Sequence, residues 1–254
     1  HHPTRREPRR LLIAGLILAV LLTSTLSGVF GMVGGMILLG FLLFLLPVEA
    51  AIAAQGVIQL VANSSRAYFS REWIDWRIIR YAVLGIGAAL LLLTLVEYTP
   101  NIAVVSICVG LLPVFCYIPT RWIMLDASRP PQAVLCGFLG GLLNLGVGVA
   151  GPIVDIFFAR TPMDRRKIIG TKASLVLISH LAKIALYSAA LSGLENRELI
   201  AISVALPFSV MGSLIGHAIL SRFTNEGFRR GTVILITVVG LFYLGQGFLL
   251  LTRS

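Results

Sequence analysis

The amino-acid sequence predicts an all-α integral membrane protein, with about seven transmembrane helices and two re-entrant helical hairpins arranged as an inverted-topology repeat. Hydrophobic residues make up 57% of the 254 residues and charged residues only 13%, about half the share found in soluble domains. The hydrophobic residues form blocks of about twenty, long enough to cross a bilayer core of about 30 Å. Two blocks are interrupted by clustered glycines, and polar residues in two others recur at a fixed distance.

The first hydrophobic block, residues 11–46, is too long for one ordinary span of about 20 residues. Glycines interrupt it between Gly28 and Gly35, and a similar break lies between Gly146 and Pro152. A broken backbone is tolerated in a membrane only where it lines a cavity or is buried in protein. We therefore expect a retained first span followed by a re-entrant hairpin at 27–46, and a second hairpin at 136–158. The other blocks predict spans at 48–69, 78–96, 102–120, 168–192, 199–221 and 231–252.

The distribution of basic residues favours this topology. If all eight blocks were simple crossings, the Lys and Arg of the loops would divide 12 to 7 between the two sides of the membrane. With two hairpins, one side holds 17 of the 21 Lys and Arg. The positive-inside rule makes that side cytoplasmic, which predicts a multi-pass protein of the cell (cytoplasmic or inner) membrane with a cytoplasmic N-terminus. The segments on that side are the N-terminus, 66–80, 121–131, 159–167 and 222–230.

Because three crossings follow each hairpin, the second half is predicted to enter the membrane from the opposite side, as in many secondary transporters. The expected units are an N-terminal segment with the first span (1–26), repeat 1 (27–131) and repeat 2 (132–254). A shift of 117 residues supports the repeat by aligning the following pairs: Gln55 with Lys172, Asn63 with His180, Arg66 with Lys183, Gly31 with Gly148 and Gly34 with Gly151. A shift of 113 is an alternative register for the hairpins, since it pairs Gly28 with Gly141 and Gly35 with Gly148.

The second repeat carries ionisable residues within its spans. Each such group costs roughly 2.5–3.5 kcal/mol on insertion scales, so it indicates function by default. Lys183 and His180 are three residues apart and share a helix face. The alternative is a packed histidine and a lysine paired with a buried carboxylate such as Asp155. Lys172 lies five residues after Lys167, so its side chain has the alternative of extending to the interface.

The first repeat carries a polar stripe. Gln55, Gln59 and Asn63 recur every four residues and lie on one helix face, where the alternative role is interhelical hydrogen bonding. Arg66 extends the stripe, with contact to lipid phosphate as its alternative. Asn144, before the second break, is a further candidate donor.

The excess of cations and neutral donors in the spans predicts an anion-binding cavity, because Coulomb energy rises as the local dielectric falls. Half-helix N-termini at the breaks would add backbone N–H groups. The glycines expected to permit these breaks are Gly31, Gly34, Gly35, Gly148 and Gly151. The expected partners are a small anion, membrane lipid and a coupling proton or ion, for which His180 titrates in a suitable range. Asp155 has three alternative roles: ion-pair partner, proton carrier or residue at the hairpin base.

Several classes of protein do not fit the pattern. The net charge of +10 does not indicate nucleic-acid binding, because the basic residues lie in short gaps between hydrophobic blocks. The three cysteines lack metal-ligand spacing, and no catalytic triad or phosphate-binding loop is recognisable. We therefore expect no metal, no cofactor and no enzymatic activity, and the pattern leaves the oligomeric state open.

The chain resembles the sulfite exporter family TauE/SafE over most of residues 26–250. The resemblance rests on two glycine-rich motifs, at 26–35 and 140–148, each followed by an apolar run and a polar span, and on the Trp-Ile-Asp-Trp sequence at 73–76. It implies transport of sulfite, sulfonates such as sulfoacetate, or related organic anions across the cytoplasmic membrane. The chain departs from the family pattern at Met36, where a third glycine is usual, and at Thr171 and Lys172, where an added positive charge suggests a different anion.

These observations predict a secondary transporter of a small anion that works by alternating access. An anion channel is the first alternative, because the same cationic lining would serve it. A membrane enzyme or assembly factor is the second, and it would need a nucleophile or metal set that the sequence does not contain.

Overall fold

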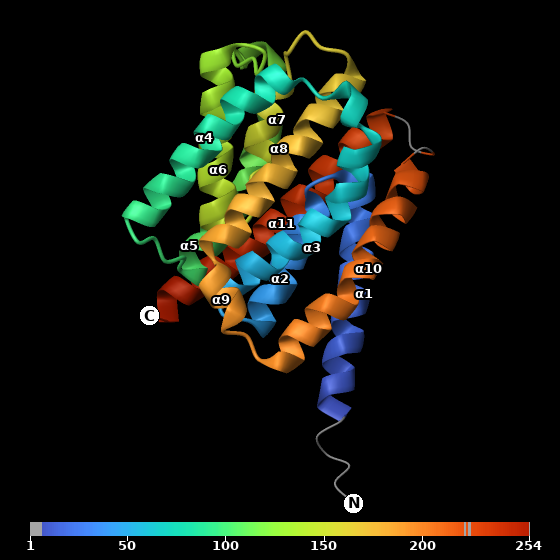
Figure 1. Ribbon diagram of the computed structural model, residues 1–254, viewed down its shortest axis with the longest axis vertical. Helices are drawn as coiled ribbons and strands as arrows, with labels where there is room; N and C mark the ends of the chain where they lie inside the picture. The colour runs from blue at the N-terminus through green and yellow to red at the C-terminus, as the bar shows by residue number, and fades with distance from the viewer. Residues whose placement is uncertain (1–6, 221, 223–224, 254) are drawn as a thin grey trace, which may run out of the picture.

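The computed structural model describes residues 7–220, 222 and 225–253, and in this part of the chain every regular element is a helix (Figure 1). The first half contains α1 (Glu7–Phe30), α2 (Val33–Leu45), α3 (Val48–Phe69), η1 (Arg71–Trp73), α4 (Trp76–Leu95), α5 (Ile102–Leu111), η2 (Leu112–Tyr117) and η3 (Thr120–Trp122). The second half contains α6 (Pro130–Val147), α7 (Gly151–Phe158), α8 (Arg165–Leu186), α9 (Ser188–Ser192), α10 (Asn196–Leu220) and α11 (Asn225–Arg253).

Six of the described helices are long and apolar enough to cross a membrane, so the chain is a multi-pass membrane protein. These candidate spans are 11–30, 76–95, 130–147, 166–186, 196–220 and 230–252. Two shorter apolar helical stretches cover 33–45 and 102–117. The predicted span at 48–69 corresponds to α3, whose 22 residues could cover about 33 Å. Its stripe of Gln55, Gln59 and Asn63 lowers its hydropathy, and α3 is not among the six candidates.

The first backbone break lies later than predicted. Helix α1 continues through Gly28 to Phe30 and ends at Gly31, whose φ is +67°. The predicted boundary at residue 26 therefore falls inside α1, and the predicted hairpin at 27–46 was wrong: this range holds the end of α1 and the single helix α2. Gly28 serves packing instead, because a Cβ there would lie 2.7 Å from the backbone oxygen of Ser213.

The second break produces a helical hairpin. Helix α6 ends in Gly148, whose φ is +88°, and α7 then runs back beside α6. The backbone N–H of Ala127, just before α6, donates to the carbonyl of Phe157 at the end of α7 over 2.9 Å. The chain therefore leaves this hairpin at the end where it entered, and the hairpin begins at Pro130 rather than at residue 136.

Several local features recur at an offset of 117 residues. Helices α3 and α8 both contain 22 residues, with starts at 48 and 165 and ends at 69 and 186. Helices α1 and α6 end at residues 30 and 147, and the same hydrogen bond closes both, from Gly31 to Ser27 (2.9 Å) and from Gly148 to Asn144 (3.1 Å). The two positive-φ glycines thus follow the register of 117 residues, not the alternative of 113.

Helices from the two halves pack against one another throughout the bundle. Helices α3 and α8 cross it side by side in opposite directions (Figure 1), with Gln55 against Lys183 and Ser70 against Gly170. Around this central pair, α1 packs on α10, α4 on α6, and α5 on α11.

The loops divide between two ends of the bundle. Arg166 stacks over Trp73, and Arg160 donates to the carbonyl of Ile123, so the segments 66–80, 121–131 and 159–167 meet at one end, at the top of Figure 1. We call this the basic end. It holds the C-termini of α3 and α10.

The start of α1 lies at the opposite end. Leu12 and Leu16 line a small cavity together with Glu198, which follows the α9–α10 connection. The expectation that the N-terminus shares a side with segments 66–80 and 159–167 was therefore wrong, because α1 itself runs the length of the bundle. Arg5 and Arg6, which entered that expectation, lie outside the described residues.

Candidate functional site

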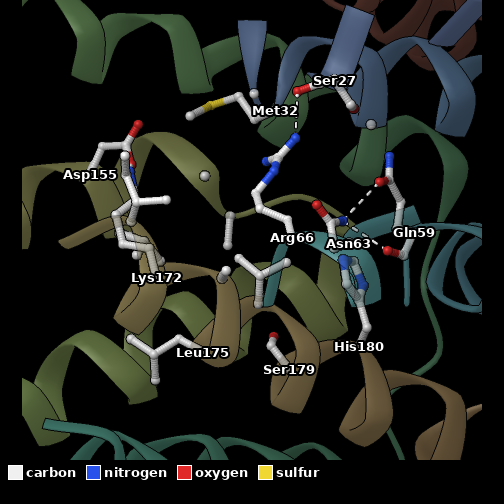
Figure 2. A pocket seen from close by; sticks show the side chains of 18 of the residues that line it. Ser27, Met32, Gln59, Asn63, Arg66, Asp155, Lys172, Leu175, Ser179 and His180 are labelled. Carbon is white, nitrogen blue, oxygen red and sulfur yellow. Dashed lines mark hydrogen bonds and ion pairs between the residues drawn. The ribbon is translucent and has the colours of Figure 1, made fainter. Parts of the chain in front are cut away.

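A cavity of about 850 Å³ lies between the two halves. It reaches from Gln55 and His180, deep in the bundle, to Ser70, Trp73 and Arg166 at the basic end. Both glycine turns border it, and α3 and α8 face each other across it (Figure 2). The cavity therefore gathers polar side chains that are far apart in the sequence.

The polar stripe of α3 forms one wall. Asn63 donates from Nδ2 to the side-chain oxygen of Gln59 over 3.2 Å and to its backbone carbonyl over 2.8 Å. The guanidinium of Arg66 donates to the carbonyl of Ser27 in the last turn of α1 over 3.2 Å, as Figure 2 shows. Arg66 thus places its positive charge at a helix C-terminus, where the helix dipole favours a cation.

Helix α8 forms the facing wall with Lys172, Ser179 and His180. His180 is 6% exposed, and its Nδ1 has no hydrogen-bond partner in the described structure. A buried polar atom without a partner costs free energy, so this nitrogen carries an unused hydrogen-bonding position on a residue that lines the cavity.

Lys172 forms an ion pair with Asp155 of α7. The side chain of Lys172 is 32% exposed and that of Asp155 is 42% exposed, and both residues line the cavity. Of the three roles considered for Asp155, the structure supports that of ion-pair partner. The alternative that Asp155 pairs with Lys183 was wrong. The ion pair partly neutralises the charge that Lys172 brings to the cavity.

Lys183 lies behind the cavity wall. Its side chain is fully buried, and Nζ donates to the side-chain oxygen of Gln55 over 2.7 Å and to the carbonyl of Gly148 over 2.9 Å. A Cβ on Gly56 would lie 3.0 Å from the aliphatic stem of Lys183. Lys183 therefore joins α3, α8 and the turn after α6, whereas Gln55 reaches both Lys183 and the cavity.

Side chains also satisfy the free carbonyls at the end of α6. Tyr187 donates to the carbonyl of Leu145 over 2.7 Å, and Tyr98 donates to that of Gly146 over 3.1 Å. Asn144 donates to the hydroxyl of Ser179 over 2.5 Å. A helix end inside a membrane requires such partners, and here they close the inner end of the cavity.

The five glycines expected at the breaks have different surroundings. Gly31 and Gly148 have positive φ and make the turns. A Cβ on Gly34 would lie 1.9 Å from the backbone oxygen of Thr23, so Gly34 permits close packing of α2 on α1. Gly35 lies against the Gln59 amide, and Gly151 against Met32.

The turns direct the N-termini of α2 and α7 toward the cavity. Gly35, in the first turn of α2, and Gly151, the first residue of α7, both line it. The first N–H groups of a helix have no acceptor within the helix, and together with the helix dipole they favour an anion.

The cavity carries an excess of positive charge. Its formal charges among the described residues are those of Arg66, Arg166 and Lys172, against the carboxylate of Asp155. Arg166 was not identified from the sequence, although steps of three or four residues back from His180 through Val176, Lys172 and Ile169 lead to it. His217 also lines the cavity, from α10.

The sequence is similar to known proteins. The sequence model of the family described as "Sulfite exporter TauE/SafE" matches residues 16–243. A protein of Cupriavidus necator named "Probable sulfite/organosulfonate exporter TauE" is 29% identical over 218 residues, which cover 82% of each chain. No solved structure matches the chain.

Proposed function

The chain belongs to the sulfite exporter TauE/SafE family, whose members are transporters rather than enzymes, and from this premise we propose that it exports a small sulfur-containing or organic anion by alternating access. The substrate class follows the name of the Cupriavidus necator relative, which includes sulfite and organosulfonates. Sulfonates such as sulfoacetate fit the same chemistry.

The observation that carries the proposal is the cavity itself. Three cationic side chains and one carboxylate line it, and the N-termini of α2 and α7 point into it. Arg66, His180 and Asn63 are the proposed direct contacts of the anion, with the amides of Gln59 and Asn144 nearby. The ammonium group of Lys172 becomes a further contact when the anion displaces the carboxylate of Asp155 from it. Gln55 and Lys183 act behind this layer.

In this proposal the two halves, α1–η2 and α6–α11, are inverted repeats, so that α1 belongs to the first repeat. The shared offset of 117 residues and the antiparallel α3–α8 pair support this assignment. The basic end faces the cytoplasm, because its loops hold 13 Lys and Arg whereas the described residues of the opposite end hold 4, namely Arg9, Arg10, Arg197 and Arg253. The cavity then opens toward the cytoplasm, as an exporter needs for loading.

The first test is ligand binding to the purified protein. Sulfite, thiosulfate, sulfoacetate, taurine and sulfate are compared by thermal shift, where an anion at 100 times its Kd should stabilise the protein by about 2.7 kcal/mol. We expect Arg66→Gln to weaken binding at least tenfold, and Arg77→Gln, an exposed arginine outside the cavity, to leave it unchanged. Equal binding by both variants would place the site elsewhere.

Transport in liposomes separates a carrier from a channel. If the liposomes contain unlabelled anion, a carrier takes up labelled anion from outside faster. The reason is that its binding site carries an unlabelled anion outward and returns with a labelled one. A channel shows no such counterflow. The closed inner end of the cavity, with Lys183 bonded to Gln55 and Gly148, favours the carrier.

A further inference from the structure

Lys183 is a buried basic side chain whose hydrogen-bond partners are all neutral. Its side chain is fully buried, and its two hydrogen-bond acceptors are an amide oxygen of Gln55 and the backbone carbonyl of Gly148. No ion pair of Lys183 occurs among the described residues. A buried charge without a counter-charge costs several kcal/mol, so an ammonium here needs a source of negative charge.

The two acceptor oxygens around Nζ fit either protonation state of Lys183. A neutral amine has two N–H groups, which the oxygens of Gln55 and Gly148 satisfy. An ammonium has three, and the third has no acceptor in the described structure. The pocket around Nζ can therefore hold the amine without loss of a hydrogen bond, and the ammonium gains from any anion placed nearby.

The surrounding titratable groups supply no fixed counter-charge. On α8, His180 lies one turn before Lys183 and interacts with it electrostatically, and Tyr187 lies one turn after it. The phenol of Tyr98 lies near Tyr187 and bonds to α6. The carboxylate of Glu49, in the first turn of α3, also lies near Tyr187, but it forms no ion pair with Lys183 in the described structure. The charged residues of α4, Arg77 and Arg80, lie in its first two turns, near the basic end.

The cavity supplies the missing charge when it is occupied. Gln55 both accepts from Lys183 and lines the cavity, and His180 lines it one turn away on the same helix as Lys183. An anion held by His180 and Asn63 would lie one layer of side chains from the ammonium. In this low-dielectric setting, the charges of anion and ammonium attract more strongly than they would in water.

We propose that Lys183 is a proton-binding site coupled to the anion site: the amine takes up a proton when the anion binds and gives it back when the anion leaves. The inference rests on the proposed anion transport. The proton adds to the nitrogen lone pair, and no other bond changes. Each cycle then moves one proton together with the anion, which lowers the net charge that crosses the membrane by one.

The test measures protons taken up on binding. Sulfoacetate is added to the purified protein in weakly buffered solution at neutral pH, where the probe itself stays ionised, and the pH change is recorded with a dye. We expect about one proton per bound anion for the wild type and none for Lys183→Met, which keeps the length of the side chain without its basic nitrogen. Lys167→Met, an exposed lysine on the same helix, should leave the uptake unchanged.

Two further variants keep the result decisive. If His180→Gln loses the uptake whereas Lys183→Met retains it, the proton belongs to His180 and the proposal is overturned. If Lys183→Met does not fold, Gln55→Leu removes one acceptor of Nζ instead and should move the midpoint of proton uptake to lower pH, whereas an unchanged midpoint overturns the proposal. Anion binding without proton uptake by the wild type overturns this inference alone, and absence of any anion binding overturns the proposed function with it.

Discussion

Two glycines determine where the chain reverses inside the bundle. Gly31 and Gly148 have φ of +67° and +88°, a region that costs other residues about 1–2 kcal/mol. Each follows a long helix and precedes a short one whose N-terminus faces the cavity. The conformation of one residue in each half therefore determines the position of the proposed anion site.

Substitution of these two glycines should separate backbone strain from steric overlap. Gly31→Ala introduces backbone strain without steric overlap, because no atom lies within 4 Å of the new Cβ. Gly148→Ala adds an overlap, since its Cβ would lie 2.8 Å from the Leu39 side chain. We expect both variants to unfold at lower temperature than the wild type in detergent, with the larger decrease for Gly148→Ala. Equal melting temperatures would mean that Leu39 relaxes without cost.

At the scale of single residues, the sequence identified polar residues within the spans but not the groups that they contact. The spacing singled out Arg66 and Lys183 and the offset of 117 residues between them. It did not reveal that Arg66 lines the cavity whereas Lys183 is buried behind it, because an offset of 117 residues carries no information about exposure. Nor did it identify the partner of Asp155, since two lysines on one helix were candidates.

At the scale of helices, small residues set the closest approaches. A Cβ on Gly85 of α4 would lie 2.0 Å from the carbonyl of Val134 in α6, and a Cβ on Gly137 would lie 1.9 Å from the carbonyl of Ala82. Gly212 and Gly216 of α10 make comparable contacts with α1. Because lipid tails are as apolar as buried side chains, the hydrophobic effect does not drive membrane helices together, and they associate through the close packing that such small residues permit.

A matched pair of substitutions on α4 tests this packing. Gly85→Ala should separate α4 from α6 and cost about 1–3 kcal/mol, as overpacking does. Gly87→Ala has no atom within 4 Å of its new Cβ and should be neutral or gain up to about 1 kcal/mol from helix propensity. Thermal unfolding of the two purified variants measures the difference. Equal stability would contradict the α4–α6 contact.

The sequence predicted the helices and the existence of both breaks, but not the end of α1. A glycine that turns the backbone and a glycine that admits a neighbouring helix look alike in one sequence. Gly28 belongs to the second kind and Gly31 to the first. Only the position of α10, nearly 200 residues later, distinguishes them.

At the scale of the whole molecule, both halves contribute to each of the two clusters of buried hydrophobic residues. Helices α1 and α10, α4 and α6, and α5 and α11 pair across the halves, so neither half buries its surface alone. Charge counting predicted a basic end correctly for three of the described loops, but it misplaced the N-terminus. With Arg9 and Arg10 at the opposite end, the basic end still holds 13 Lys and Arg against 4 among the described residues, so the charge asymmetry between the two ends remains.

Labelling of single cysteines tests the arrangement in cells. In a variant without Cys108, Cys116 and Cys136, a cysteine replaces Glu72 at the basic end or Ser192 at the opposite end, both exposed. We expect an impermeant maleimide to label Ser192→Cys in intact cells and Glu72→Cys only after permeabilisation. Leu11→Cys, near the start of α1, should follow Ser192→Cys. Labelling of Leu11→Cys together with Glu72→Cys would restore the cytoplasmic N-terminus.

The contact between α1 and α10 also bears on how the protein is made. Gly28 and Gly216 touch in the finished molecule but are separated by 188 residues of chain, or about 9–38 s of synthesis at ordinary ribosome speeds. During that interval the face of α1 that later meets α10, with Ser24 and Gly28, has no permanent neighbour. We expect the insertion machinery or a chaperone of the membrane to shield α1 until α10 emerges, so α1 reaches its final packing only long after its own synthesis.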